Sequence, residues 1–384
     1  MNPGRHVVIA SRIFTPEGGA AAYRLAALRD ALEADGAQVT VLTSRPPGGG
    51  VPSTRSVRRW PVLRDRSGAV RGYVQYLSFD VPLLFRLWGP RRVDAIVVEP
   101  PPTTGAMVRI AARLRRVPYV YFAADVSSSA ARGIGVNPVV VRVLRAVESW
   151  VLRGAARVLA VSDGVAREVG ELGVRPERIR IVGTGVDTSL FRFDASTAAR
   201  VEPVLVYAGT MSEIQGAGVF VDAFLRIAEE FPRARLRMLG AGTERDALVA
   251  RARSTAGGDR IEFPGTVPGA TVAAELGRAA AGLASVRPGR GYDFAFATKT
   301  FVAGACGAPV IYAGVGPAGD RVAQASLGDR VDWEVDAVAD AMRRVLRSEP
   351  DVAERRRIAE WVDSHHSSRA VSAEGARAVR EVLR

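Results

Sequence analysis

The stretch Ala284–Gly316, ASVRPGRGYDFAFATKTFVAGACGAPVIYAGVG, predicts a buried strand, a Gly-rich loop, a short helix and a second strand. We expect the first strand to end near Val286, Thr298 to cap the helix and Gly307 to end it. A capped helix start directs free N–H groups and the positive end of the helix dipole into the loop, and Lys299 adds a cation there. The segment is therefore expected to receive a phosphate or a diphosphate.

Lys299 is the only lysine of the chain, because 52 of the 53 Lys and Arg residues are arginines. A lysine carries a compact ammonium with three donors, whereas arginine carries a planar fork. We interpret the single lysine as a position that requires an ammonium. The alternative is that it survives by chance in a chain with a strong preference for arginine.

The 384 residues are too many for one ordinary core, so two domains are expected. A net charge of +13 and a pI near 10.8 raise nucleic acid or an anionic membrane as partners. The arginines are scattered through helical patterns, however, and form only short clusters, as at 55–66, 91–92 and 113–116. This scatter argues against nucleic acid and leaves an anionic membrane or a nucleotide as the partner.

The single cysteine, Cys306, excludes an intramolecular disulfide and a thiolate metal cluster. The three histidines, His6, His365 and His366, follow no zinc-binding pattern, so neither a metal nor a cofactor is expected. No signal-peptide core follows Met1, and no apolar run reaches the length of a membrane span. We therefore expect a cytoplasmic protein that could contact a membrane surface peripherally. Residues 70–88 predict an aromatic-rich amphipathic helix, which we interpret as covering a core rather than as a membrane anchor.

The amino-terminal residues predict a strand–helix–strand unit of Rossmann type. The strands are expected at His6–Ser11 and Gln38–Thr43, and the helix at Ala20–Gly36. The full G-x-G-x-x-G pattern and an acidic residue after the second strand are both missing, which argues against a nicotinamide dehydrogenase. Gly18 and Gly19 precede the helix, either as a simple turn or as a place where a ligand approaches the backbone.

Asp125 follows the strand expected at Pro118–Phe122. Open α/β sheets place ligand-binding groups beyond the carboxyl ends of their strands, which makes Asp125 a candidate site residue. The alternative is that its carboxylate caps the run Ser127–Ser129.

The alternation of strand and helix patterns stops at residues 188–203 and then begins again. This indicates a linker between a first domain, residues 1–187, and a second domain, residues 204–371. The predicted fold class is therefore α/β, with two Rossmann-like, doubly wound domains.

At this point the chain resembles the retaining glycosyltransferases of family 4, which have the GT-B fold of two such domains facing across a cleft. The resemblance covers nearly the whole chain and is nearest to the colanic-acid-type branch. It rests on an ordered set of short motifs, none specific alone: Phe14–Gly19, Val161–Gly164, Gly185–Asp187, Tyr207–Thr210, Gln215-Gly216, Gly240–Gly242, Glu262–Val267, Thr298-Lys299 and Ala305–Val310.

The resemblance implies a nucleotide diphosphate sugar held mainly by the second domain and an acceptor on the first. The acceptor could be a small molecule, a lipid-linked molecule or a glycan. Lys299 would hold the diphosphate, and Asp125 would lie beside the sugar and the acceptor. The last helix, residues 372–384, would pack back on the first domain. The remaining donor-binding positions would be Gly18, Gly19, Gly209, Thr210, Gly265, Thr266, Val267, Arg287, Thr298 and Val302.

The chain departs from the family in two ways. The paired glutamates, of which one grips the ribose, correspond here to Phe294 and Val302, so ribose recognition by that route is lost. The usual Arg and Lys after the linker correspond to Thr210 and Gln215, which leaves more of the anion binding to Lys299, helped by Arg287 or Arg12.

Glycosyl transfer requires an anchored diphosphate, stabilised leaving-group charge and an aligned acceptor. Lys299, helix N–H groups and arginines could supply the charge without a metal, and in the retaining mechanism that the family implies the leaving phosphate takes the acceptor proton. Two alternatives stay open. One is a sugar-nucleotide epimerase of the same fold, and the other is a non-catalytic subunit that binds a sugar nucleotide.

Overall fold

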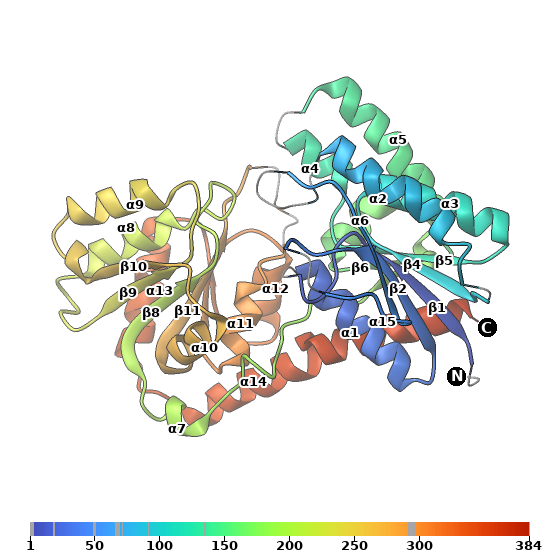
Figure 1. Ribbon diagram of the computed structural model, residues 1–384. Helices are drawn as coiled ribbons and strands as arrows, with labels where there is room; N and C mark the ends of the chain where they lie inside the picture. Colours follow the sequence, from blue (N-terminus) through green and yellow to red (C-terminus); the bar gives the residue numbers. More distant parts are fainter. Residues whose placement is uncertain are drawn as a thin grey trace. The chain divides into compact units, whose positions relative to one another are not determined.

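The computed structural model describes residues 4–17, 20–48, 51–65, 70, 72–90, 92–133, 136–290, 293 and 296–383. It divides into two compact units (Figure 1). Unit 1 comprises Met1–Gly183 and Val371–Arg384, and unit 2 comprises Thr184–Ala370.

Unit 1 is built on a seven-stranded parallel sheet with the strand order β3-β2-β1-β4-β5-β6-β7. Three of its strands, β1, β4 and β5, are almost wholly buried apolar runs, and β2 is buried along six of its seven residues, as expected when helices cover both faces of a parallel sheet. The strands are β1 (His6–Ala10), β2 (Gln38–Ser44), β3 (Val57–Trp60), β4 (Ala95–Val98), β5 (Tyr119–Ala123), β6 (Arg157–Ala160) and β7 (Ile179–Ile181).

The helices of unit 1 connect these strands and lie on the two faces of the sheet. Helices α2, α3 and α5 are neighbours in one layer (Figure 1). The last helix, α15 (Ser368–Val382), packs on unit 1, where Gly375 approaches Leu28 and Arg180 pairs with Glu374 at 2.6 Å. The other helices are α1 (Ala20–Ala34), α2 (Tyr73–Arg86), α3 (Pro102–Arg115), α4 (Ser127–Gly133), α5 (Pro138–Gly154), α6 (Asp163–Glu171) and the 3-10 turn Pro176–Arg178.

Unit 2 repeats the architecture with a six-stranded parallel sheet in the order β10-β9-β8-β11-β12-β13, enclosed by two apolar clusters. The strands are β8 (Glu202–Ala208), β9 (Arg235–Leu239), β10 (Ile261–Gly265), β11 (Ala279–Val286), β12 (Val310–Gly314) and β13 (Gly328–Val331). The helices are α7 (Ala195–Ala198), α8 (Gly218–Ile227), α9 (Arg245–Arg253), α10 (Gly269–Arg278), α11 (Lys299–Ala305), α12 (Pro317–Gln324), α13 (Val335–Arg347), α14 (Val352–His366) and the 3-10 turn Gly258–Arg260.

The structure differs from the predicted boundaries between the two units. Unit 2 begins at Thr184 rather than after Asp187, because Val186 forms a parallel bridge with Ser367. Residues 188–203 belong to unit 2 and contain the short helix α7, so they are not a free linker. Among the described residues, no helix is both long enough and apolar enough to cross a membrane.

Candidate active site

The carboxyl ends of β8, β9 and β10 place three loop glycines next to one another in unit 2. The Gly209 N–H donates to Leu239 O at 2.9 Å, and the Gly240 N–H donates to Gly265 O at 2.8 Å. A Cβ on Gly240 would lie 2.1 Å from Gly209 O, so the backbone packs there at a distance that only glycine permits. These loops form a floor at the edge of the sheet where open α/β folds bind ligands.

Lys299 lies directly over this floor. A Cβ on Gly209 would meet Lys299 Cε at 2.9 Å. The ammonium donates to Tyr207 Oη at 2.7 Å and to Gln215 Oε1 at 2.5 Å. Both acceptors are neutral, and no ion pair to Lys299 is found in the described part of the chain. An ammonium has three donors, so one remains for a ligand.

The electrostatics of this position follow from that arrangement. The side chain of Lys299 is half-buried, and the loss of water around it lowers its pKa to about 7. Burial, followed by the charge of Glu244, raises the pKa of Tyr207, so the phenol stays protonated and donates to Thr210 O at 2.7 Å. The site thus holds a cation whose charge lacks compensation, which is the condition for attracting an anion.

Gln215 is held at both ends. Its carbonyl oxygen accepts from Ser285 Oγ at 2.6 Å, while its side chain accepts from Lys299. The neighbouring residues are fixed by Arg287 N donating to Ile214 O at 2.9 Å and by Trp333 Nε1 donating to Gly216 O at 3.0 Å. The loop after β8 is therefore positioned by groups from the end of β11, from α11 and from the loop after β13, and Gln215 is a site residue.

The expected N-cap at Thr298 is wrong. Thr298 has helical dihedral angles, φ −56° and ψ −26°, and its side chain makes no capping hydrogen bond. An N-cap needs an extended backbone so that its oxygen can reach back to the first amides. The amides of Thr300 and Phe301 donate instead to the carbonyls of Ala297 and Thr298. With only seven residues in α11, anion binding there depends chiefly on Lys299.

An aromatic stack holds α11 in place from behind. The Phe301 ring stacks on His366 at 3.9 Å and on Phe296 at 5.2 Å between ring centroids. Burial lowers the pKa of His366 to about 4, so its imidazole is neutral in this stack. Gly307 ends the helix with φ 76°, as predicted.

The other residues expected to bind the donor differ in their partners and in their burial. The Arg287 guanidinium stacks on Trp333, 4.6 Å from the ring centroid, beside Gly216 rather than on Lys299. Val302 is partly buried against the apolar cluster that includes Phe301. Gly265 completes the loop floor, with Thr266 exposed and Val267 partly buried after it. Gly18, Gly19 and Phe294 lie outside the described residues.

Unit 1 has its own concave site at the carboxyl ends of β1, β4 and β5. The pocket has a volume of about 210 Å³ and is lined by Arg12, Arg24, Glu99 and Asp125, among others. Glu99 is buried and accepts from Arg24 at 3.1 Å and from Ser11 Oγ at 2.8 Å. Burial raises the pKa of Glu99, and Arg24 opposes that shift. The Arg12 guanidinium lies over Tyr76, 3.7 Å from the ring centroid.

Asp125 opens into this pocket, and its alternative role as a helix cap is taken by another residue. The amides of Ser127 and Ser128, which begin α4, donate to the two carboxylate oxygens of Glu148 at 2.8 and 2.9 Å. Asp125 keeps an exposed surface, yet the protein around it excludes enough water to raise the pKa of its carboxyl, and Arg24 opposes the shift. Asp125 is thus available to a ligand.

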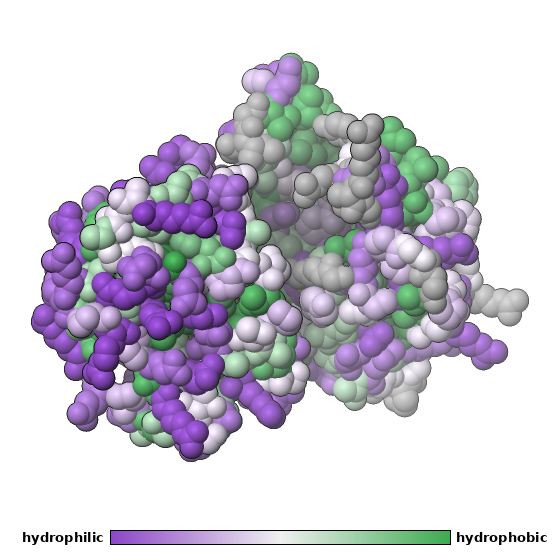
Figure 2. Space-filling view, turned by 60° about the vertical axis from the view of Figure 1, so that its left-hand side comes forward, coloured by the Kyte–Doolittle hydropathy of each residue, from purple (hydrophilic) through white to green (hydrophobic). Residues whose placement is uncertain are grey.

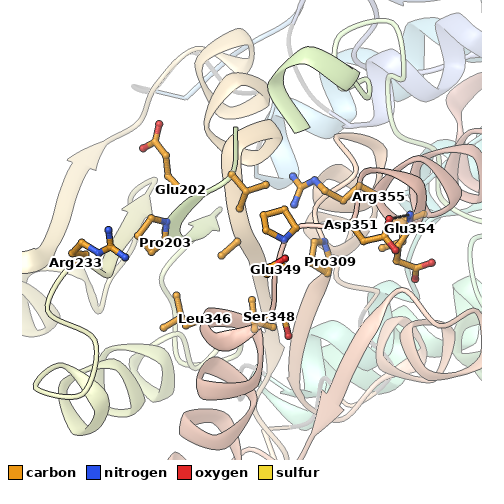
Figure 3. Close-up of a pocket in the computed structure, with 15 residues that line it drawn as sticks. Glu202, Pro203, Arg233, Pro309, Leu346, Ser348, Glu349, Asp351, Glu354 and Arg355 are labelled. Atoms are coloured by element: carbon orange, nitrogen blue, oxygen red, sulfur yellow. Dashed lines mark hydrogen bonds between the residues drawn. The ribbon is translucent and has the colours of Figure 1, made fainter. Parts of the chain in front are cut away.

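A larger cavity of about 690 Å³ lies at the opposite, amino-terminal edge of the unit 2 sheet (Figure 3). Its lining includes Glu202, Pro309 and the buried Arg355, which donates to Ala279 O at 3.0 Å and to Gly277 O at 2.8 Å. None of the predicted site residues line it, so we do not assign it to the active site. Within the described residues, no group of three or more His, Cys, Asp or Glu side chains could hold a metal ion.

Both parts of the chain match known glycosyltransferase domains. Residues 18–185 match the family described as "Glycosyl transferase 4-like domain", and residues 202–348 match "Glycosyl transferases group 1". The glycogen synthase of Mycobacterium tuberculosis (strain CDC 1551 / Oshkosh) is 28% identical over 217 residues, which is 56% of this chain and 51% of that protein. The chain thus matches about half the length of this relative.

Solved structures resemble the whole chain. Sucrose-phosphate synthase of Thermosynechococcus elongatus aligns with a TM-score of 0.76 and 18% identity over 98% of this chain and 99% of that chain. Anabaena HepE, solved in complex with UDP, aligns with a TM-score of 0.69 and 15% identity over 98% of this chain and 100% of that chain. At these identities the likeness establishes the fold. The two domains form a GT-B fold, and each contains a stretch that matches a glycosyltransferase domain family.

Sequence reasoning missed several residues of the two sites. Tyr207 was only part of a motif, and Gln215 was interpreted as a lost cation rather than as a partner of Lys299. Glu99 and Arg24 were not singled out, although Glu99 directly follows a buried strand, which is the same signal that pointed to Asp125. Applying that rule to every strand would have found Glu99.

Proposed function

We propose that this chain is a retaining glycosyltransferase of family 4, nearest to the colanic-acid-type branch. It would move a sugar from a nucleotide diphosphate sugar to a hydroxyl, or another nucleophile, of an acceptor. The observation that carries the proposal is the ammonium of Lys299, which is half-buried over the Gly209 loop with only neutral partners. An anionic ligand would supply the charge that this ammonium lacks.

A diphosphate suits this position for a physical reason. Desolvation lowers the pKa of Lys299 to about 7, and a nearby phosphate would raise it again and fix the proton on the amine. As the sugar departs, negative charge grows on the diphosphate, so the attraction to Lys299 strengthens in the transition state. The UDP complex of HepE, a protein with the same fold, supports this assignment of the donor.

We assign the acceptor to the pocket of unit 1. The two arginines that line this pocket, Arg12 and Arg24, are matched in number by the carboxylates Glu99 and Asp125, so a neutral, hydroxyl-rich acceptor fits it better than an anion. Asp125 would accept a hydrogen bond from the acceptor or the donor sugar and align it for transfer. A small molecule, a lipid-linked sugar or a glycan could each present such hydroxyls. We do not propose nucleic acid as a partner of this chain.

Metal independence and retention belong to the same proposal. Lys299 and the loop amides would stabilise the leaving diphosphate in place of a metal ion. In the retaining reaction, the leaving phosphate oxygen would accept the proton of the attacking hydroxyl on the same face of the sugar. Asp125 would then position the hydroxyl without having to act as a strong base.

The test begins with the donor. A thermal-shift panel of nucleoside diphosphates identifies the base, because a ligand that binds only the folded state raises the melting temperature. The matching sugar nucleotide is then incubated with candidate acceptors. Release of nucleoside diphosphate only when acceptor is present supports the transferase. A new sugar nucleotide formed without acceptor would show an epimerase, and binding without turnover would show a non-catalytic subunit.

Two further measurements address the finer points. The anomeric configuration of the product, determined by nuclear magnetic resonance at early times, distinguishes retention from inversion. Turnover in the presence of a metal chelator should stay unchanged, and a loss restored by added divalent cations would contradict the role given to Lys299.

A further inference from the structure

Unit 1 exposes an apolar surface on three neighbouring helices. Eleven large apolar side chains of α2, α3 and α5, and of the turn that follows α2, are between 36% and 71% exposed. We call this surface the α2–α3–α5 face (Figure 1). Its members are Val74, Leu77, Val81, Phe85, Trp88, Ile110, Leu114, Val139, Val140, Val143 and Trp150.

The α2 helix shows that this exposure is systematic. Its exposed residues Val74, Leu77, Val81 and Phe85 recur at intervals of three or four, so they form one stripe along the helix. A second stripe, with Phe79 and Leu83, is fully buried in the core. The helix is therefore apolar on both its buried and its exposed side. A helix whose outer side faces only water usually carries polar residues there. The sequence-based interpretation of this segment as a mere core cover is incomplete.

Direct contacts join the three helices into one surface. Thr104 of α3 donates to Asp80 of α2 at 2.6 Å, and Arg109 of α3 stacks on Trp150 of α5, 4.2 Å from the ring centroid. Exposed apolar side chains gathered on neighbouring helices of one unit mark an interaction site more often than an accident of composition. In Figure 2, hydrophobic side chains gather on the upper part of unit 1, whereas unit 2 is mainly hydrophilic.

The exposed charges on these helices are of one sign. The three helices carry seven arginines and two carboxylates, and both carboxylates, Asp80 and Glu148, are buried and hydrogen-bonded. Among their described residues, no carboxylate is exposed. Three of the arginines are exposed, namely Arg113, Arg142 and Arg153, and four are partly buried, namely Arg86, Arg109, Arg115 and Arg145. The face thus combines apolar side chains with uncompensated positive charge.

We propose that the α2–α3–α5 face docks on an anionic phospholipid bilayer. Apolar side chains would enter the boundary between headgroups and acyl chains, and the arginines would meet lipid phosphates. Trp88 and Trp150 belong to the residue type that favours this boundary. A second copy of the chain fits less well, because a two-fold interface through this face would place arginines against arginines. The proposal does not depend on the activity proposed above.

Vesicle flotation tests the proposal with the full chain. Vesicles of phosphatidylcholine with about one third phosphatidylglycerol should carry the protein at low salt, whereas pure phosphatidylcholine should bind it at least ~10-fold more weakly. Replacing two apolar residues with L77S/F85S should weaken partitioning into the anionic vesicles by ~10-fold or more. The matched control, Y23S/L190S, removes two exposed apolar side chains elsewhere and should bind like the wild type.

A charge variant separates the two contributions. R113Q/R142Q should reduce binding to anionic vesicles by roughly 25-fold, since each basic residue near such a surface adds a factor of about five. The control R200Q/R253Q removes two exposed arginines of unit 2 and should leave binding unchanged. Circular dichroism and thermal melting check that each variant folds.

Three outcomes would overturn the proposal. The first is a wild-type protein that does not float with anionic vesicles. The second is equal binding by L77S/F85S and Y23S/L190S. The third is a wild-type dimer, measured by light scattering, that L77S/F85S converts to a monomer while neither protein binds vesicles, since the face would then be a contact between copies.

Discussion

The two units have the same topology at the sheet edge that faces a ligand, but they differ in whether the cation at that edge is paired with a carboxylate. In unit 2, the cation Lys299 donates to Tyr207 and Gln215, which are neutral. In unit 1, Arg24 is paired with the buried Glu99 at 3.1 Å. The same sheet edge therefore presents an uncompensated positive charge in one unit and a compensated pair in the other.

This difference indicates which ligand each unit can take. An ammonium with a pKa lowered to about 7 gains most from a partner of negative charge, as a diphosphate offers. A pocket whose partly buried arginine is already paired with a buried carboxylate gains little from an anion but can exchange hydrogen bonds with hydroxyl groups. The fold alone assigns neither ligand, because both units share it. The side chains at the strand ends make the assignment.

The largest effect should come from removing the uncompensated charge. Lys299→Ala should lower kcat/KM for transfer by ~10²–10³-fold, the scale of losing one preorganised charge stabiliser. Lys299→Arg should also be poor, because the ammonium packs on Gly209 and a longer planar fork cannot take its place. Steady-state kinetics measures both variants.

Arg290→Gln provides the control for this prediction. It removes a nearby loop cation that pairs with Glu213 at 3.5 Å, and its effect should be small because that pair is exposed. Near-normal turnover of Lys299→Ala would contradict the contrast between the two units.

The next effect concerns the pocket of unit 1. Asp125→Asn should lower transfer by ~10²-fold or less, because positioning rather than proton removal is at stake. The dissociation constant of the nucleoside diphosphate should not change, since unit 2 holds the donor. Titration calorimetry and kinetics together check this separation.

Glu148→Gln is the matched control for Asp125→Asn. Glu148 caps α4 through two amides, so its loss should cost about 1–3 kcal/mol of stability and little specific activity per folded molecule. If Asp125→Asn instead lost stability and kept its activity, the carboxylate of Asp125 would have a structural role.

The doubly wound fold could be predicted because its signal is carried by local patterns. Buried strands such as β1 and β5 are apolar runs of strand length, and the glycine at 307 marks a helix end that the structure shows. The edge strand β3 escaped prediction. Its sequence, VRRW, alternates buried and exposed residues, and it lies within the arginine cluster at 55–66, where no strand was predicted.

The sites could be predicted only in part, because their partners come from distant segments. Lys299 stood out by its place at a predicted helix start and by composition, but its hydrogen bonds to Tyr207 and Gln215 span 92 and 84 residues. The cap of α4 shows the same limit. Asp125 was the nearest acid in sequence, whereas Glu148, which follows Ser128 by 20 residues, reaches the amides from α5. Spacing along the chain cannot rank such tertiary partners.

A smaller effect should appear in the pH dependence of donor binding. The folded protein lowers the pKa of Lys299 to about 7, so the ammonium is charged below that pH and becomes neutral as pH rises above it. At pH 7 about half of the Lys299 side chains carry the charge, so attraction for a diphosphate should weaken by about 10-fold between pH 7 and 9. Calorimetric titration at several pH values checks this, and Lys299→Met should abolish the trend. A flat profile in the wild type would mean that the charge of Lys299 does not change in this range.

The smallest effect concerns the ribose. The position where relatives place a ribose-binding carboxylate is Val302, which is partly buried against apolar side chains and cannot accept a hydrogen bond. The donor would then be held by its phosphates and its base, with little discrimination at the ribose hydroxyls. Replacing ribose with 2′-deoxyribose in the correct nucleoside diphosphate should change the dissociation constant by less than ~5-fold, under ~1 kcal/mol.

A protein with a buried acceptor for that hydroxyl would lose considerably more, because its acceptor would be left unpaired. Titration calorimetry with the two nucleotides at one pH below 7 decides the question, since Lys299 is then charged in both experiments. A loss of ~50-fold or more corresponds to over 2 kcal/mol and would require a hydrogen-bonding group at the ribose. In that case unit 2 would select its donor by the ribose hydroxyls as well as by the charge of the diphosphate. The two units would then differ less in the ligand groups that they recognise, because the pocket of unit 1 is also proposed to bind hydroxyls.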